Sequence, residues 1–208
     1  FIATIQPDDG PGFQSFCYPG SIPGHTFART DTGLVQTVNN LRLQGVHPTL
    51  PRMVIGRAIL DCQQLDDALE LLNRHNDSGG FHMTLAQAGD PRLMSVEYGG
   101  GSCSQRCLGA PAVHANHALH LGIAAHNQSI TRSSADRQSR GEALLSQGCL
   151  DALAMLRESG GDGLPIFRDA PDDPDDENTL ATVIFQLHDR SVVWRILDGS
   201  GTVWSDAD

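Results

Sequence analysis

The sequence predicts an α+β fold, in which strands and helices form separate groups along the chain instead of alternating. Two observations carry this prediction. β-Prone runs separated by glycine- and proline-rich turns fill the first 40 residues, and apolar residues at helical spacing follow between Met53 and Leu72. Grouped strands and grouped helices are typical of sheets and helices packed as layers. We expect a single domain over residues 1–208.

The first group is predicted to be a β-meander. Its strands are Phe1–Gln6, Phe13–Tyr18, His25–Arg29 and Leu34–Val38. The segment Pro7–Gly12 is predicted to be the turn between the first two strands, because proline and glycine suit the backbone angles that turns require.

Two helices follow the meander. Apolar residues from Met53 to Cys62 fit one helical face, and Pro51 offers an entry. The second helix spans Leu65–Leu72, with Asp66 and Asp67 in the first turn, where the helix dipole favours negative charge.

A hairpin is predicted next, from Phe81–Ala86 and Leu93–Tyr98. The glycine-rich stretch after it is expected to be a loop that holds Cys103 and Cys107, and Ala112–His117 is expected to be a short strand.

The C-terminal part of the chain repeats the grouping of helices and strands. Ala135–Leu145 and Leu150–Leu156 are predicted helices, and the acidic stretch Asp172–Glu177 is predicted to be a solvated loop rather than a Ca²⁺ site. Thr179–Leu187 and Val192–Leu197 then form an apolar closing hairpin.

Composition excludes several classes of function. All 14 basic residues are Arg, Asp and Glu number 25, and the formal net charge is -11, so neither nucleic acid nor an anionic membrane surface is an expected partner. Five cysteines are an odd number for a disulfide framework and favour reduced thiols in the cytoplasm, although a Cys103–Cys107 bridge stays open. No phosphate-binding glycine loop is present, and we expect no cofactor.

A cluster of possible metal ligands gives one enzyme hypothesis. His120 and His126 follow the four side chains that could assemble a zinc site: Cys103, Cys107, His114 and His117. If the 112–117 segment is a strand, its two histidines point to opposite faces and cannot share an ion. The alternative is a polar strand end with hydrogen-bonded histidines.

Two further groupings could bind a substrate. Asn39 and Asn40 end a predicted strand, where side-chain amides can donate to an oxyanion, although paired Asn also occurs in plain turns. Arg137 and Arg140 share a predicted helix face and could clamp a carboxylate, or they belong to a solvated helix start.

Several segments together resemble a known family. The segments Tyr18–Gly24, Gly33–Asn40 and His114–His117, with Arg52 and its helix pair between them, resemble the acyl-coenzyme A:6-aminopenicillanic acid acyltransferase family. This family is the C45 group of N-terminal-nucleophile hydrolases. The resemblance implies a four-layer αββα sandwich, here without the N-terminal segment that bears the nucleophile.

The resemblance also implies a mechanism. A precursor cleaves itself and exposes a Cys whose α-amino group is the base for its own thiol. That Cys then cleaves the carbon–nitrogen bond of an acyl amide, or a thioester, and holds the acyl group as a thioester. We expect the Cys upstream of Phe1, in a companion N-terminal segment or chain, and expect Cys17 to be a buried thiol.

Site residues follow from the same resemblance. Asn116 and Asn40 correspond to the stabilisers of the oxyanion, and four residues correspond to the substrate-binding group: Arg137, His114, His117 and Asn39. Two alternatives remain. One is a catalytically inactive relative that binds or scaffolds, and the other is the zinc-dependent hydrolase. The oligomeric state is not predicted.

Overall fold

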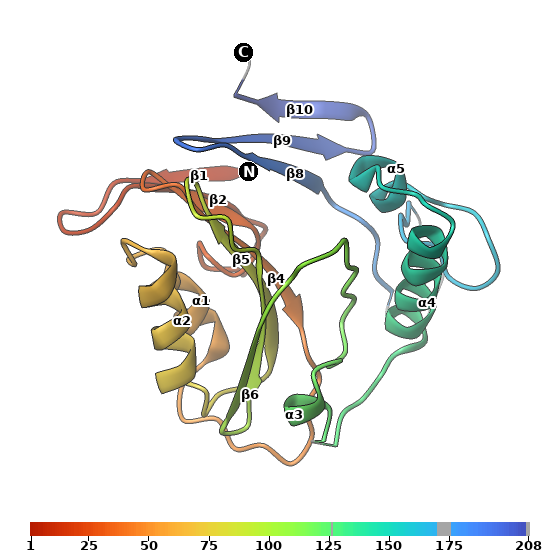
Figure 1. The fold of residues 1–208 in the computed structure, drawn as a ribbon, viewed down its shortest axis with the longest axis horizontal. Helices are drawn as coiled ribbons and strands as arrows, with labels where there is room; N and C mark the ends of the chain where they lie inside the picture. The colour runs from red at the N-terminus through yellow and green to blue at the C-terminus, as the bar shows by residue number, and fades with distance from the viewer. Residues whose placement is uncertain (126, 170–175, 207–208) are drawn as a thin grey trace. The chain divides into compact units, whose positions relative to one another are not determined.

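The structure, a computed structural model, describes residues 1–125, 127–169 and 176–206 (Figure 1). The chain divides into two compact units. The first contains Phe1–Gly109, Asn116–Ser129 and Leu187–Val192, and the second contains Ala110–Ala115, Ile130–Gln186 and Val193–Asp208. Strands and helices occur in separate groups along the chain, which confirms the predicted α+β class.

The first unit is built on a seven-stranded antiparallel sheet in which each strand pairs with the next one along the chain. The strands are β1 (Ile2–Ile5), β2 (Phe13–Phe16), β3 (Ala28–Thr30), β4 (Leu34–Asn40), β5 (Phe81–Gln87), β6 (Met94–Gly99) and β7 (Ser102–Cys107). The meander and the hairpin predicted from the sequence are confirmed, although β3 begins later than expected. The prediction of a loop around the two cysteines is wrong, because they lie on β7.

The register of the central strands separates an apolar face from a polar one. Asn39 pairs with His82, His82 with Glu97, and Glu97 with Ser104 across β4 to β7. Ser95 lies two residues before Glu97, so these five side chains project from one face, called the polar face below. The alternate residues of β5 and β6 project from the other face and form the main core of the unit.

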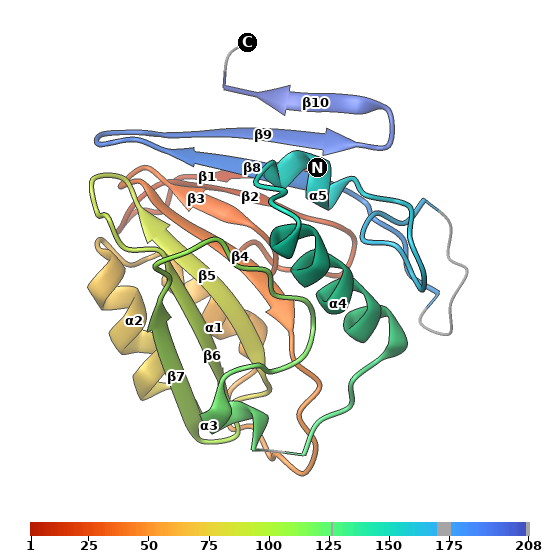
Figure 2. The same ribbon diagram turned by 45° about the vertical axis from the view of Figure 1, so that its right-hand side comes forward.

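Two helices, α1 (Arg52–Ile59) and α2 (Leu65–Arg74), cover that apolar face (Figures 1 and 2). α2 places Leu65, Ala68, Leu69 and Leu72 in the core, each 7% exposed or less. Burial of a leucine side chain contributes about 1.5–3 kcal/mol, so this stripe holds the helix to the sheet. Both predicted helices are confirmed, although α1 ends before Cys62.

The segment from 110 to 117 is not a strand, which corrects the prediction for Ala112–His117. Its backbone bonds instead to side chains: the N–H of Ala115 donates to Gln138 Oε1 at 2.8 Å, and Gln138 Nε2 donates to the oxygen of Val113 at 3.2 Å. The short helix α3 (Leu121–Ala124) follows in the first unit.

The second unit contains α4 (Arg132–Ser146), α5 (Ala152–Leu156) and an antiparallel sheet of β8 (Thr182–Leu187), β9 (Val192–Asp198) and β10 (Gly201–Ser205). The Thr131 hydroxyl caps α4 by accepting from the N–H of Ser134. The predicted helices and closing hairpin are confirmed, and β10 was not predicted. Most of the predicted acidic loop lies outside the described residues.

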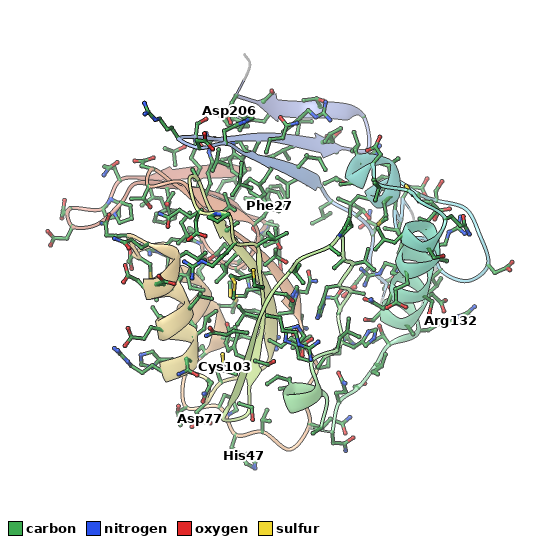
Figure 3. The ribbon with its side chains drawn as sticks, in the orientation of Figure 1. Phe27, His47, Asp77, Cys103, Arg132 and Asp206 are labelled. Carbon is green, nitrogen blue, oxygen red and sulfur yellow. The ribbon has the colours of Figure 1, made fainter. Side chains whose placement is uncertain are left out.

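Aromatic side chains form the centre of the smaller sheet. Trp194 is fully buried, stacks on Phe185 at 5.4 Å between ring centroids, and meets the edge of Trp204 at 5.1 Å. The carboxylate of Asp206, labelled in Figure 3, accepts from the N–H of Trp194 at 2.9 Å. No helix within the described residues has both the length and the apolar character needed to cross a membrane.

Candidate active site

The two asparagines predicted to stabilise an oxyanion lie together in the first unit. Asn116 Nδ2 donates to the backbone oxygen of Asn40, the last residue of β4, at 3.4 Å. The residues are 76 positions apart in the chain, so only the fold brings them together. A side-chain amide nitrogen carries two hydrogens, and one bond to a carbonyl orients both of them.

A buried carboxylate fixes the segment that follows Asn116. Glu97 Oε1 accepts from the N–H of Leu119 at 2.6 Å, and Glu97 Oε2 accepts from the N–H of His120 at 3.0 Å. Glu97 is fully buried on the polar face of β6. Hydrogen bonds to a charged acceptor are stronger than those between neutral groups, so Glu97 is a strong anchor of this loop.

The side chains of Asn39 and Asn40 project from opposite faces of the sheet, as neighbours on a strand do. Asn39 Nδ2 lies 3.4 Å from His82 Nδ1 on the polar face. Asn40 shares the other face with Phe81, and its Oδ1 is buried without a hydrogen-bond partner in the part of the chain that the structure describes. The backbone of Asn40 thus contacts Asn116, whereas its side chain does not.

Arg137 lies in the second unit, on α4. Its Nε donates to both the backbone oxygen and the Oγ of Ser133 at 3.2 Å. Arg168, which is only 5% exposed, donates from Nη1 to the same Oγ at 3.2 Å. Two guanidinium groups therefore meet at one serine hydroxyl, and guanidinium groups suit carboxylate recognition.

Arg140 does not join Arg137 in the predicted carboxylate clamp. Its Nη2 forms an ion pair with Glu158 at 2.6 Å. The hydrogen bond that Arg140 donates to the Glu158 carboxylate raises the pKa of Arg140. This pair ties α4 to the segment after α5.

The two histidines of the His114–His117 motif are both half-buried and fall in different units. His114 Nδ1 contacts the backbone oxygen of Ala115 at 2.9 Å, in the segment that Gln138 holds. His117 follows Asn116 in the first unit.

The zinc hypothesis gains no support from the described residues, which contain no group of three His, Cys, Asp or Glu side chains able to hold a metal ion. Cys103, labelled in Figure 3, and Cys107 stand four residues apart on one strand, a separation of about 13 Å. Both thiols are free, so the bridge left open by the sequence is not formed. His126 lies outside the described residues.

The environments of the cysteines do not favour nucleophilic chemistry at Cys17, Cys62 or Cys103. Cys17 is 1% exposed and its Sγ donates to the oxygen of Ser15, which confirms the expected burial. Burial, with Asp67 and Asp61 nearby, raises the pKa of Cys62 to about 11. Burial also raises the pKa of Cys103. Since the thiolate is the nucleophile, a raised pKa makes a thiol less reactive.

Sequence reasoning missed four of the groups that hold these candidates in place: Glu97, His82, Ser95 and Arg168. It named His120 only as a possible metal ligand. A signal was present on β6, where Ser95 and Glu97 alternate with Met94, Val96 and Tyr98. This alternation predicts one polar face. The full burial of both faces of β6 could not be anticipated, because loop residues from 116 onward cover the polar side.

Comparison with known proteins settles the family. A sequence model of the acyl-coenzyme A:6-aminopenicillanic acid acyl-transferase family matches residues 1–201. The chain belongs to this family. The resemblance inferred from the sequence motifs is therefore confirmed.

Two relatives of this acyl-transferase family member are informative. The β-alanyl-dopamine/carcinine hydrolase of Drosophila melanogaster is 24% identical over 208 aligned residues, covering 86% of this chain and 50% of the relative. The chain thus spans about half the length of that curated relative. The structure of penicillin V acylase from Agrobacterium tumefaciens superposes with a TM-score of 0.58 at 16% identity, over 92% of this chain and 67% of the acylase. This likeness identifies the fold as that of the N-terminal-nucleophile hydrolases.

Proposed function

We propose that this chain forms the scaffold and the oxyanion side of an enzyme that cleaves carbon–nitrogen amide bonds, or transfers the acyl group, through a Cys thioester. The nucleophile is an N-terminal Cys in a companion segment or chain upstream of Phe1. Family membership and the names of the two relatives, one a hydrolase and the other an acylase, support an enzyme of this class. The contact between Asn116 and Asn40 is the observation that carries the proposal.

The proposed reaction has two acyl transfers. The Cys Sγ attacks the amide carbonyl carbon, and the thiol proton passes to the α-amino group of the same Cys. That proton then moves to the leaving nitrogen as the carbon–nitrogen bond breaks, leaving an acyl thioester. Water or an amine attacks the thioester, releases the acid or a new amide, and restores the thiol.

Asn116 stabilises the negative oxygen that forms in each transfer. Its Nδ2 is a neutral donor held by Asn40, and the loop behind it is anchored on Glu97. A donor that is already oriented before the reaction costs little reorganisation, which is why loss of one such donor lowers kcat by about 10²–10³-fold. We assign Asn40 to the same role through its backbone contact with Asn116.

The remaining candidates are assigned to substrate binding. Arg137, beside Arg168, is the residue for a substrate carboxylate. Asn39 contacts the substrate from the polar face, and His114 and His117 shape the surroundings. All five cysteines of the chain are free thiols, which supports a reducing compartment such as the cytoplasm.

An activity assay on the whole protein, including the segment upstream of Phe1, tests the proposal. Carcinine and penicillin V are suitable first probes, because the named relatives act on them or are named for them. We expect cleavage of at least one, formation of a Cys thioester visible by mass spectrometry, and a loss of about 10²–10³-fold in kcat for Asn116→Ala.

A matched substitution controls for general effects of losing an asparagine. Asn73 is exposed on α2, and Asn73→Ala should keep the full rate. Unchanged turnover in Asn116→Ala removes that residue from the mechanism. A whole protein that folds but forms no thioester and cleaves neither probe points instead to the inactive binding or scaffold relative.

A further inference from the structure

A continuous chain of hydrogen bonds crosses the polar face of the first unit. It runs from Ser104 on β7 through His120 and Ser95 to His82 on β5, and ends at Asn39 on β4. His120 Nδ1 lies 3.2 Å from the backbone oxygen and 3.1 Å from the Oγ of Ser104, and His120 Nε2 lies 3.1 Å from Ser95 Oγ. Ser95 Oγ is 2.9 Å from His82 Nε2, and His82 Nδ1 is 3.4 Å from Asn39 Nδ2.

The chain is shielded from water. His82, Ser95 and His120 are 2%, 5% and 4% exposed. Figure 2 shows β5, β6 and β7 side by side, so the relay spans adjacent strands. In such surroundings a hydrogen bond is strong and a mismatched donor or acceptor is costly, so the direction of each bond matters.

Two atoms of Ser104 face His120 Nδ1: the backbone oxygen, which can only accept, and the Oγ, which can accept or donate. A proton on His120 Nδ1 satisfies the backbone oxygen, and in a neutral ring Nε2 is then an acceptor. Ser95 donates to His120 Nε2. The Ser95 oxygen is left to accept from His82, which must carry its proton on Nε2.

The far end of the relay agrees with this derivation. With the proton on Nε2, His82 Nδ1 is an acceptor, and the atom 3.4 Å away is the amide nitrogen of Asn39, which is a donor. The direction of the hydrogen bonds derived at Ser104 thus agrees with the donor found at the other end of the relay, the amide nitrogen of Asn39. The oxygen of that amide is directed away from His82, because the two polar atoms of an amide diverge from one carbon.

Two charged residues pair across the sheet with members of the relay: Glu97 and Arg106. Glu97 pairs with His82 across the sheet, but its two oxygens accept from the backbone N–H groups of Leu119 and His120. Arg106 pairs with Ser95 across β6 and β7 and is exposed. Glu97 therefore anchors the backbone beside His120, while the serine–histidine relay controls the orientation of its ring.

We propose that His82 is a positioning residue: the relay from Ser104 holds the Asn39 amide in one orientation, so that Asn39 presents its Oδ1 to an N–H group of the substrate. This inference rests on the proposed function only for the substrate contact of Asn39. The relay itself is a property of the folded protein. The proposal assigns different tasks to the two asparagines. Asn39 accepts a hydrogen bond from the substrate, and Asn116 donates one to it.

Histidine nitrogen NMR on the whole protein tests the relay without any substrate. We expect the proton of His82 on Nε2 and that of His120 on Nδ1 at about pH 7.5, where an ordinary imidazole is neutral. The signals of His82 are assigned by their loss in His82→Gln. Finding His120 protonated on Nε2, or either ring doubly protonated at that pH, would overturn the proposal.

Two substitutions at His82 then separate positioning from plain structural support. The side-chain amide of His82→Asn reaches the place of the imidazole Nδ1, so this variant keeps a possible acceptor for Asn39. The longer side chain of His82→Gln places its amide where Nε2 stood, so this variant keeps only the contact with Ser95. With penicillin V or carcinine as the probe, we expect kcat/KM to fall at least about tenfold more in His82→Gln than in His82→Asn. The two variants should melt at similar temperatures.

Equal losses in the two variants would show a structural role and overturn the assignment. The NMR result and the activity are independent measurements. If the protons lie where predicted but neither probe is cleaved by the unaltered protein, the relay stands and the proposed function fails.

Discussion

The carboxylate of Glu97 accepts the backbone N–H of His120 at 3.0 Å, across 23 positions of the chain. With the second bond, to Leu119, this contact joins the middle strands of the larger sheet to the loop that begins at Asn116. Glu97 was not a candidate in the sequence, because an isolated Glu in an apolar strand carries no motif. The two bonds fix the backbone at Leu119 and His120 to the sheet.

Glu97→Gln should lower both stability and activity. A glutamine can accept one of the two backbone N–H groups, but its own –NH₂ then faces the other, and a buried unpaired donor costs about 1–3 kcal/mol. Urea unfolding measures this loss. In Glu70→Gln, an exposed change that removes an ion pair with Arg74, the loss should stay below about 1 kcal/mol. Equal effects in the two variants would contradict the anchoring role.

Thiol reactivity should follow burial rather than position in the chain. At about pH 8, the raised pKa of Cys62, about 11, keeps its thiol protonated. Cys107 is exposed. We expect iodoacetamide to modify Cys107 well before Cys62 and Cys17, as followed by peptide mass spectrometry on native protein. Rapid labelling of Cys62 would show that its pocket opens.

Tyr98→Phe should leave stability unchanged or raise it. Tyr98 is fully buried, and its hydroxyl has no hydrogen-bond partner among the described residues. Removing a buried polar group without a partner is neutral or favourable, by up to about 1 kcal/mol. Thermal melting measures the effect, with Tyr18→Phe as a control at an exposed site. A marked loss of stability would mean that the hydroxyl bonds to ordered water.

Asp90 should contribute stability that disappears in acid. Hydrogen bonds from the Arg92 guanidinium, with a further bond from its backbone N–H, lower the pKa of Asp90 from 3.8 to about 2. A lowered pKa in the folded state means that the contribution is complete above about pH 4 and is lost as the pH falls towards about 2.

Asp90→Asn should therefore lower the melting temperature at about pH 6 and converge with the unaltered protein at about pH 2. The loss of melting temperature should also be smaller in high salt, because the ion pair between Asp90 and Arg92 lies near the surface. Asp8→Asn, in an exposed turn, serves as the control. A difference in melting temperature between Asp90→Asn and the unaltered protein that grows as the pH falls would contradict this prediction.

The sequence predicted those elements whose signals are local. The helix Leu65–Arg74 carries its apolar stripe and its acidic first turn within ten residues, and the strands β5 and β6 carry their own alternation. The segments Tyr18–Gly24, Gly33–Asn40 and His114–His117, together with Arg52 and its helix pair, indicated the family. These features depend on the spacing of residues near one another, which the fold does not alter.

Two incorrect predictions have a common cause. β7 is largely polar and exposed, and it becomes a strand because β6 supplies its hydrogen-bond partners. The segment 112–117 alternates enough to suggest a strand, yet its backbone groups bond to Gln138 instead of a neighbouring strand. The partner of a strand is a distant part of the chain, and local composition does not specify it.

Tertiary structure alone decided how the candidate site is built. Asn40 meets Asn116, and Ser95 links two histidines, because the antiparallel register places particular residues opposite one another and a loop returns over the same face. The direction assigned to the relay rests on its two ends, the Ser104 backbone oxygen, which can only accept, and the Asn39 amide nitrogen, which can only donate. The sequence by itself thus determined the family and the local elements, and the fold determined which polar groups meet, since hydrogen bonds need contact and contact is not local.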